Sequence, residues 1–272
     1  MGISRQGFYQ YEQRSVAFVV ISQQIIDFAK STRDNHPRMG ARNIYLKMSS
    51  APECQEWFSQ IGRDKVETIL LNNGFRIKKV RAYYKTTIRG FFVFDNLIKV
   101  LIINRINQVW VSDITYFFVV EAGEVTHYYL TFIMDLYSRH VLGYAVSMNL
   151  TTEATTLPAL EMALKTRNIT TQNQLEGLIL HSDGGGQYAD KNFVAKIRFF
   201  GIQSSMGKEA YENPNAERLN GTIKNDYLIP WHVESFSLLN LLTAKAVKLY
   251  NTDRPHSALK GLSPVEFEKL VK

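Results

Sequence analysis

Three strand-like runs follow one another from residue 109 onward, and this succession constrains the fold more than any other feature. QVWVSDITYFFVV, HYYLTFIMDL and RHVLGYAVSM are rich in β-branched and aromatic residues. The EAGE turn bounds the first run, and the DLYSR segment joins the last two as a hairpin. Helix-like and strand-like segments then alternate, as TTEATTLPALEMALKTR, GLILHSD, DKNFVAKIRFFG and IQSSM. This order predicts an α/β fold with a mixed five-stranded sheet flanked by helices.

The first third of the chain has helical periodicity. Apolar residues recur at near-helical spacing in 16–32, 36–48 and 61–75, and the last of these ends at an Asn-Asn-Gly stop. Two short helices separated by a loop, the second carrying Arg63 and Lys65, are compatible with a DNA-binding helix-turn-helix. The alternative is two helices of a small bundle with solvated charges, and the pattern alone leaves it open.

Positive charge is concentrated at the end of this helical region. The chain carries 32 Lys and Arg against 25 Asp and Glu, a net charge of +7. Residues 63–89 hold eight basic side chains against two acidic ones, a local charge of +6, with Tyr83 and Tyr84 interleaved. Such a segment suits neutralisation of a phosphate backbone together with base stacking, and a solvated basic linker is the alternative. We take 76–108 as the connection between two domains.

Several classes of protein are excluded by residues that the sequence lacks. Cys54 is the only cysteine, which excludes a disulfide framework and a cysteine-rich zinc site within one chain. The first residues, MGISRQGFYQYEQRS, have no apolar segment of a secretory signal. No run approaches roughly eighteen uninterrupted apolar residues, the length of a membrane span. We therefore expect a reducing, cytosol-like setting and no membrane partner.

Asp183 stands in an unusual place, in the segment LHSDGGGQYAD. The glycines do not form a phosphate-binding loop of the Walker type, because Gln187 and Tyr188 follow them instead of Lys and Ser or Thr. An ionised carboxylate at the end of an apolar strand is costly unless it is paired, hydrogen-bonded or bound to metal. Strand ends in open α/β sheets are also where ligands bind. A carboxylate that merely caps the turn remains the alternative.

Asp113 makes a functional interpretation stronger, because it lies within WVSDITYF, a strand with almost no other charge. Close carboxylates repel one another, and a divalent cation shared by Asp113 and Asp183 would remove that conflict. Such a site needs a third ligand.

The segment ENPNAERLNGTIKNDYL offers that ligand on a predicted helix. Asn213 is a plausible N-cap and Pro214 a good first helical residue. Glu217 then falls in the early turns, with Asn220 and Lys224 three and seven residues later on the same face. A carboxylate, an amide and an ammonium together suit a metal beside a phosphate, although an ordinary amphipathic helix has such faces too.

These motifs resemble those of a known family. WVSDITYF, HSDGGGQY and NAERLNGTIK are similar to the three acidic motifs of DDE transposases with a retroviral-integrase-like catalytic core, and most similar to the downstream-frame (OrfB) transposases of bacterial insertion sequences. The resemblance extends through MDLYSRHVLGYAVS and YNTDRPHSALKGLSPVEF, and near the start through MGISRQGFYQ, HPRMGARNIYLKM and IGRDKVETILLNNGF. It therefore covers nearly the whole chain.

The resemblance implies an RNase H-like core in which Asp113, Asp183 and Glu217 are catalytic and bind two Mg²⁺ ions, with Mn²⁺ as a substitute. The implied reaction is DNA strand cleavage and strand transfer at the ends of an insertion sequence. Asp183 lies 70 residues after Asp113, and 33 residues separate it from Glu217. That second interval is two residues shorter than in many relatives, which puts the geometry of the loop GKEAYEN in doubt. Two alternatives are kept: a non-catalytic DNA-binding regulator of the fused transposase, and an RNase H-like nuclease without joining activity.

Other roles follow from the charge pattern and from the resemblance. The expected DNA-binding residues are Arg63, Lys65, Arg76, Lys78, Lys79, Arg81, Asn220 and Lys224. His181 and Ser182 are expected to be structural, and Asn251, Arg254 and His256 to pack and hydrogen-bond around the core.

The expected organisation has five segments, and the expected partners are nucleic acid and protein. The segments are a leading helical segment (1–30), a helix-turn-helix-like DNA-binding domain (31–75), a basic linker (76–108), an RNase H-like integrase catalytic core (109–230) and a C-terminal helical extension of the core (231–272). The partners implied by the resemblance are terminal inverted repeats, target DNA and an upstream-frame product joined by frameshifting. It also implies a homo-oligomer on DNA and a place in the bacterial cytoplasm, associated with the nucleoid.

Overall fold

The computed structural model describes residues 4–78, 94–121, 123–208 and 212–271. The chain divides into two compact units, one of Met1–Val80 with Pro255–Gly261 and the other of Arg81–Arg254 with Leu262–Lys272. Residues 79–93 of the expected basic linker lie outside the described residues, so the role of this segment stays a prediction, as does the division into five segments.

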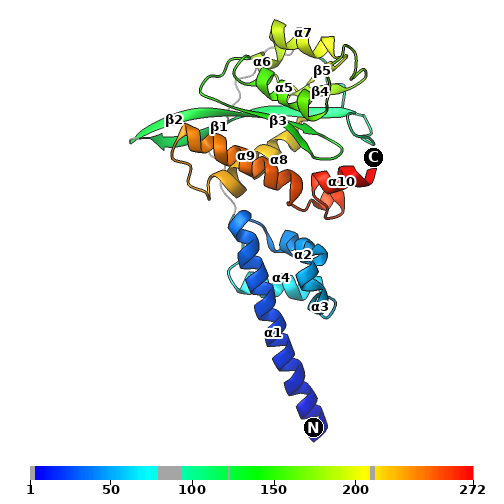
Figure 1. Cartoon of the computed structure of the whole chain (residues 1–272), viewed down its shortest axis with the longest axis vertical. Coiled ribbons are helices and arrows are strands. Elements are labelled where there is room, and N and C mark those ends of the chain that lie inside the picture. Colours follow the sequence, from blue (N-terminus) through cyan, green and yellow to red (C-terminus); the bar gives the residue numbers. More distant parts are fainter. Residues whose placement is uncertain (1–3, 79–93, 122, 209–211, 272) are drawn as a thin grey trace. The chain divides into compact units, whose positions relative to one another are not determined.

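The N-terminal unit is helical, as the periodicity predicts (Figure 1). Its elements are α1 (Arg5–Asn35), α2 (Ala41–Ser50), η1 (Pro52–Cys54), α3 (Gln55–Phe58) and α4 (Arg63–Asn72). The side chain of Ser4 caps α1 by accepting a hydrogen bond from the backbone N–H of Gly7 at 3.1 Å. The C-terminal half of α1 packs on the bundle through residues such as Ile25 and Ala29, both fully buried.

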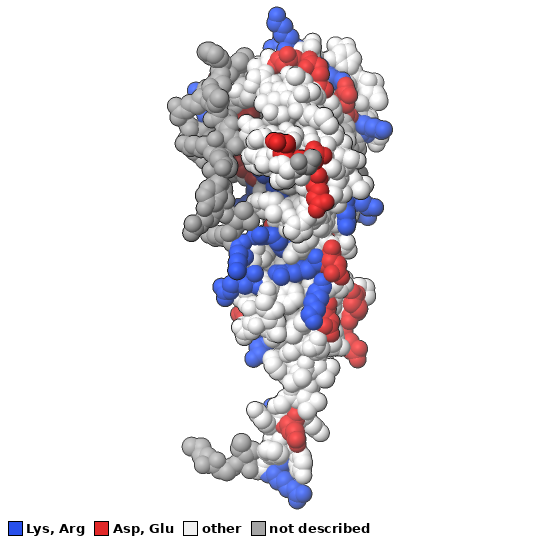
Figure 2. Space-filling model, turned by 90° about the vertical axis from the view of Figure 1, so that its left-hand side faces the viewer, with Lys and Arg blue, Asp and Glu red and all other residues white. Residues whose placement is uncertain are grey.

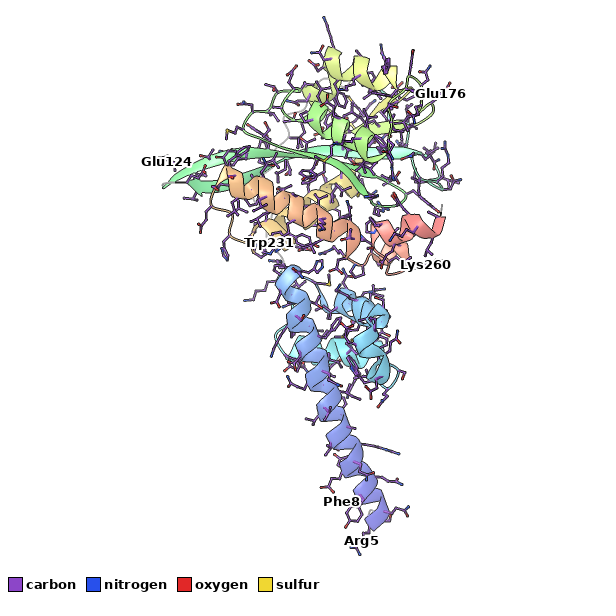
Figure 3. All side chains as sticks on the ribbon, in the orientation of Figure 1. Arg5, Phe8, Glu124, Glu176, Trp231 and Lys260 are labelled. Carbon is purple, nitrogen blue, oxygen red and sulfur yellow. The ribbon has the colours of Figure 1, made fainter. Side chains whose placement is uncertain are left out.

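Two features of this unit differ from the expectation. Helix α1 spans Arg5–Asn35 and is thus longer than the helical run expected over 16–32. The two predicted helices are present as α2 and α4, but η1 and α3 occupy the intervening segment that was expected to be a loop. In addition, apolar side chains on the N-terminal half of α1 are exposed, and Phe8 projects from the helix with 55% of its surface accessible (Figure 3).

The second unit is built on the predicted mixed sheet of five strands. Its strands are β1 (Val109–Glu121), β2 (Glu124–Asp135), β3 (Val141–Ser147), β4 (Ile179–Ser182) and β5 (Gln203–Met206), in the order β3-β2-β1-β4-β5. The first three strands pair antiparallel, while β4 lies parallel to β1 and β5 parallel to β4. This arrangement confirms the predicted fold class, an RNase H-like sheet preceded by an all-helical region.

Helices cover both faces of the sheet (Figure 1). One face carries α5 (Thr156–Thr166), α6 (Gly186–Ala189) and α7 (Lys191–Phe199). The other carries α8 (Pro214–Gly221), the π-helix η3 (Thr222–Leu228) and α9 (Phe236–Thr252); η4 (Ser257–Leu259) and α10 (Pro264–Val271) follow along the chain.

Two hydrophobic cores, one on each side of the sheet, hold these layers together. Side chains alternate along β1, so Trp110 belongs to the core beneath α5 and α7, and Val111 to the core beneath α8 and α9. Gly143 of β3 lets α5 approach closely, since a Cβ atom there would lie 2.1 Å from the carbonyl oxygen of Ala159. Within the described residues, no helix has both the length and the apolar character needed to cross a membrane.

Candidate active site

Asp113 lies near the middle of β1, and its side chain faces α8. The side-chain amide of Asn220, on α8, donates a hydrogen bond from Nδ2 to Oδ2 of Asp113 at 2.8 Å. Burial raises the pKa of Asp113 to about 8, with further contributions from the charges of Asp183 and Glu217. Three carboxylates from distant parts of the sequence are thus close enough to interact electrostatically.

Asp183 directly follows β4. The parallel pairing of β1 with β4 ends at Val111 and His181, and the same register carried two residues further brings Asp113 level with Asp183. The backbone N–H of Gly185 donates to Oδ1 of Asp183 at 3.2 Å, which lowers the pKa of this carboxyl, whereas burial raises it and outweighs that effect. The carboxylate therefore occupies the strand end that the sequence predicts.

Glu217 lies in the first turn of α8, which begins at Pro214 as expected. The structure has Asn213 at the predicted N-cap position. Its side chain makes no capping hydrogen bond and donates from Nδ2 to the carbonyl oxygen of Ser112 at 2.9 Å. Glu217 is exposed, yet partial burial raises its pKa above the ordinary value.

Asp183 and Glu217 both lie near Asp113, but the described residues contain no group of three His, Cys, Asp or Glu side chains that could hold a metal ion as they stand. Asp183 and Glu217 nevertheless both contribute to the raised pKa of Asp113. Asp183 and Glu217 therefore each lie within electrostatic range of Asp113, and the role of the three carboxylates as a catalytic triad stays a prediction.

Lys224 lies in the π-helix η3, directly after α8, and its side chain reaches β1 close to Asp113. After Gly221 the helix continues as the π-helix η3, a form that is rare and frequent at functional sites. Nζ of Lys224 donates to Oγ1 of Thr115 at 2.6 Å and to the carbonyl oxygen of Tyr116 at 3.3 Å. Burial lowers the pKa of Lys224, while the charge of Asp113 opposes this change. The expected face of carboxylate, amide and ammonium thus lies against β1.

The basic residues expected to bind DNA have different surroundings in the N-terminal unit. Arg63, in α4, forms an ion pair with Asp64 at 2.8 Å, and Nζ of Lys65 lies 4.9 Å from the ring centroid of Phe18. The side chains of Arg76 and Lys78 are exposed. Lys79 and Arg81 lie outside the described residues.

The residues expected to be structural support the core. The amide of Asn251 accepts from the backbone N–H of Val141 and donates to its carbonyl oxygen, both at 2.9 Å, and so binds α9 to β3. Arg254 pairs with Asp226 at 2.7 Å. Nδ1 of the buried His181 is 2.9 Å from Oγ of Ser205. His256 lies in the segment just before η4.

Two hydroxyl groups beside the carboxylates, those of Ser112 and Tyr188, are not evident as site residues from the sequence. Ser112 precedes Asp113 and is fully buried, and its Oγ lies 2.8 Å from the hydroxyl of Tyr188, in the helix after Asp183. A serine next to a buried aspartate on a strand is the one local signal that could have drawn attention to this pair.

Comparison with known proteins identifies the family. Two family models described as integrase core domain match residues 104–211 and 201–264. The transposase InsF of insertion sequence IS3A from Escherichia coli K12 is 30% identical over 75% of this chain and 69% of its own length. The chain belongs to the IS3 family of DDE transposases.

Other relatives of this transposase cover different shares of its length. The 31 kDa protein of insertion element IS600 from Shigella sonnei is 28% identical over 98% of this chain and 96% of its own. A transposase for IS986/IS6110 from Mycobacterium tuberculosis is 34% identical over 60% of this chain and 58% of its own. Among solved structures, the catalytic core of HTLV-2 integrase in complex with magnesium is similar, with 20% identity, a TM-score of 0.45, and coverage of 59% of this chain and 95% of that one.

Proposed function

We propose that this insertion-sequence transposase cuts and joins DNA strands at the ends of its own element, with Asp113, Asp183 and Glu217 as the catalytic carboxylates. The observation that supports the proposal is the meeting of β1, the end of β4 and α8 at Asp113: Asn220 of α8 is hydrogen-bonded to its carboxylate, and Asp183 and Glu217 lie near enough to add to the effect of burial on its pKa. Perturbed carboxyl groups that converge from separate elements are typical of functional sites.

Divalent metal ions fit the chemistry of these donors. Carboxylate oxygens are the ligands that Mg²⁺ prefers, and the repulsion that raises the pKa of Asp113 would be relieved by a cation. We infer that the three side chains move closer together around two Mg²⁺ ions, or around Mn²⁺ as a substitute. When bound, such a pair activates a water molecule or a DNA 3′-hydroxyl and stabilises the leaving oxygen of an in-line displacement.

The protein's own residues then orient the reacting groups. In this proposal the amide of Asn220 holds the carboxylate of Asp113, because the two are hydrogen-bonded at 2.8 Å. Lys224 turns from Thr115 toward a DNA phosphate when the substrate enters, since its ammonium lies at the edge of the same site. Asn220 contacts DNA only after local opening, because its side chain is buried.

The remaining DNA contacts, the partners and the domain roles belong to the same proposal. Phosphate contacts by Arg63, Lys65, Arg76, Lys78, Lys79 and Arg81 would bind the terminal inverted repeats and the target, with 31–75 as the DNA-binding domain and 109–230 as the catalytic core. The acting form is a homo-oligomer on DNA, fused by frameshifting to an upstream-frame product and associated with the nucleoid.

An excision assay tests the catalytic assignment. A plasmid carries the coding region between its native flanks, and circular or joined-end DNA is amplified across the new junction. Asp183→Asn should remove every junction while binding to the element ends is retained. Asp190→Asn is the matched control, because Asp190 caps α7 and asparagine is an equally good N-cap. Junctions in Asp183→Asn at the wild-type level would refute the triad.

The purified chain separates the two alternative functions from the main one. Strand transfer gives branched or circular products, whereas a nuclease without joining activity gives only shortened strands. Binding of the ends in Mg²⁺ without any product would indicate a regulator, or a chain that depends on its upstream partner.

A further inference from the structure

The backbone ladder between β1 and β4 stops before it reaches Asp113 and Asp183. Pairing between β1 and β4 ends at Val111 and His181, and Asp113 and Asp183 each lie two residues beyond that last pair. Beyond that pair the two strands are held by their outer neighbours, with Asp113 opposite Phe132 of β2 and Ser182 opposite Met206 of β5. Side-chain contacts between β1 and the segment after β4 therefore add to the backbone in setting the separation of these carboxylates.

Ser112 lies at the point where the pairing stops and makes three hydrogen bonds there. Its hydroxyl donates to the carbonyl oxygen of Phe132 at 2.9 Å. Because its single hydrogen is used in that bond, its Oγ accepts from the hydroxyl of Tyr188, 2.8 Å away. Its carbonyl oxygen accepts from Nδ2 of Asn213 at 2.9 Å.

Each of the three partners of Ser112 lies in, beside or opposite a segment that carries one of the proposed catalytic carboxylates. Tyr188 lies in α6, which closes the glycine turn after Asp183. Asn213 precedes α8, and its carbonyl oxygen accepts from the backbone N–H of Glu217 at 3.3 Å. Phe132 is the β2 residue directly opposite Asp113.

The tyrosine hydroxyl also lies within range of both aspartates. Burial raises the pKa of Tyr188 well above its usual range, and the charges of Asp183 and Asp113 add to this. Tyr188 is 2% exposed, so its hydroxyl has no route to bulk water and depends on Ser112 as its acceptor.

We propose that Ser112 is a positioning residue whose hydroxyl, through Tyr188 and the carbonyl oxygen of Phe132, sets the separation of Asp113 and Asp183 and thereby the affinity of the site for divalent metal. The inference rests on the proposed function, since it assumes that these carboxylates are the ligands. Groups that orient metal ligands typically contribute about 10- to 100-fold in affinity or activity.

Binding of Mn²⁺ to the purified full chain, followed by electron paramagnetic resonance, tests the proposal without requiring activity. Ser112→Ala and Tyr188→Phe should each weaken Mn²⁺ binding by about tenfold or more. The double variant should bind about as weakly as the weaker single variant, because both substitutions remove the same hydrogen bond.

Two matched variants control for the loss of a buried hydroxyl. Ser205→Ala removes a buried hydroxyl that contacts His181 and Leu97, and Tyr250→Phe removes one that contacts Sδ of Met134 at 3.7 Å. Both should keep wild-type Mn²⁺ affinity, and thermal unfolding verifies that every variant is folded.

The outcomes distinguish a failure of the positioning role of Ser112 from a failure of the proposed metal site. Wild-type affinity in folded Ser112→Ala and Tyr188→Phe would overturn the positioning role while leaving the metal site intact. Equal losses in the control variants would also overturn it, because any buried hydroxyl would then have the same effect. A wild-type chain that binds no Mn²⁺ would refute the proposed metal site itself, and the positioning role with it.

Discussion

Asp113 is enclosed by protein and faces two other carboxyl groups, which makes it the most perturbed acid of the site. Its pKa of about 8 means that the carboxyl holds a proton at neutral pH when no cation is bound. A divalent ion bound at the proposed site would have to displace this proton, so metal binding and proton release would be coupled. Nζ of Lys224, on η3, donates to Thr115 and Tyr116 of β1, and burial lowers its pKa while the charge of Asp113 opposes that change.

The stability of the metal-free protein should consequently depend on the protonation of Asp113. In the unfolded chain this carboxyl ionises near pH 4, whereas the native state keeps its proton until about pH 8. The unfolded state then binds fewer protons between these values, so wild-type stability should fall as pH rises, at most by about 1.4 kcal/mol per unit. Asp113→Asn cannot titrate and should lack this component.

Denaturant unfolding in chelator at pH 5 and pH 8 measures the difference. Wild type should lose stability relative to Asp113→Asn between the two values, and Mn²⁺ at pH 8 should restore it only in wild type. Parallel behaviour of the two proteins would mean that Asp113 ionises normally.

The sequence shows which charged residues lie in apolar strands, but not which residues contact them in the fold. Asp113 and Asp183 stand out because a charge in an apolar strand is costly. Ser112 does not, because hydroxyls are ordinary on strands and its importance comes from a contact 76 positions away. Asn213 has a clear local signal, since its position suits an N-cap. Its side chain nevertheless donates to the backbone carbonyl of Ser112 and does not cap the helix.

Helix α10 is joined to the sheet and to α5 by one buried carboxylate. Glu268 accepts two hydrogen bonds from the guanidinium of Arg167, at 2.6 and 2.7 Å, and one from Oγ of Ser138 at 2.6 Å. Burial alone would raise the pKa of Glu268, but hydrogen bonds from Arg167, His140 and Ser138 outweigh it and hold the pKa well below its usual range.

Glu268→Gln should therefore destabilise the second unit by about 3 kcal/mol, the lower end for a broken buried pair, because the buried Arg167 then keeps only Asp135, at 3.6 Å, as a counter-charge. The folded pKa lies below the unfolded one, so the contribution is complete above about pH 4.5 and is lost as pH falls below it. Unfolding at pH 7 and pH 3 checks both statements. Glu161→Gln, at an exposed ion pair with Lys196, should change little at either pH.

The packing of α5 on β3 depends on Gly143, because a larger residue there would meet the backbone of α5. A Cβ atom at Gly143 would lie 2.1 Å from the carbonyl oxygen of Ala159 and 2.7 Å from the backbone nitrogen of Ala163. Because both neighbours are backbone atoms, Gly143→Ala should cost about 3 kcal/mol or more, the upper end of overpacking. Gly62→Ala, where a Cβ atom would meet nothing, is the control. Equal unfolding midpoints for wild type and Gly143→Ala would show that the helix can move away freely.

The succession of strands along the chain could be predicted, but the form of some helices could not. Strand runs are distinguished by their alternation and by the turns between them, and all five were recognised. The π-helix η3 could not be recognised, because apolar spacing over two turns does not distinguish it from an α-helix. Helix α3 is only four residues long, too short for a periodic signal.

Charge across the molecule is unevenly distributed in a way that bears on DNA binding. On the face of the helical unit shown in Figure 2, Lys and Arg side chains gather toward one side and Asp and Glu toward the other. Helix α4 carries Arg63 and Lys65 together with Asp64 and Glu67, so its charges cancel locally. The exposed Arg76 and Lys78 follow it without an acidic neighbour in the sequence. The strongest phosphate contacts are therefore expected after α4 instead of on it.

The salt dependence of binding to the element ends tests this distribution. Each phosphate contact contributes about 0.9 to the slope of log affinity against log salt concentration. Arg76→Ala and Lys78→Ala should each reduce the slope by about one and weaken binding to all sequences alike. Arg63→Ala should reduce it less, because Asp64 and Glu67 already neutralise this guanidinium.

Fluorescence anisotropy of labelled end DNA over a range of salt concentrations gives the slope. Arg5→Ala, at the exposed start of α1, is the control and should leave the slope unchanged. An unchanged slope for both Arg76→Ala and Lys78→Ala would remove them from the interface. A larger effect of Arg63→Ala than of either would favour α4 as the helix that meets DNA, because its arginine would then have to exchange the bond to Asp64 for a phosphate.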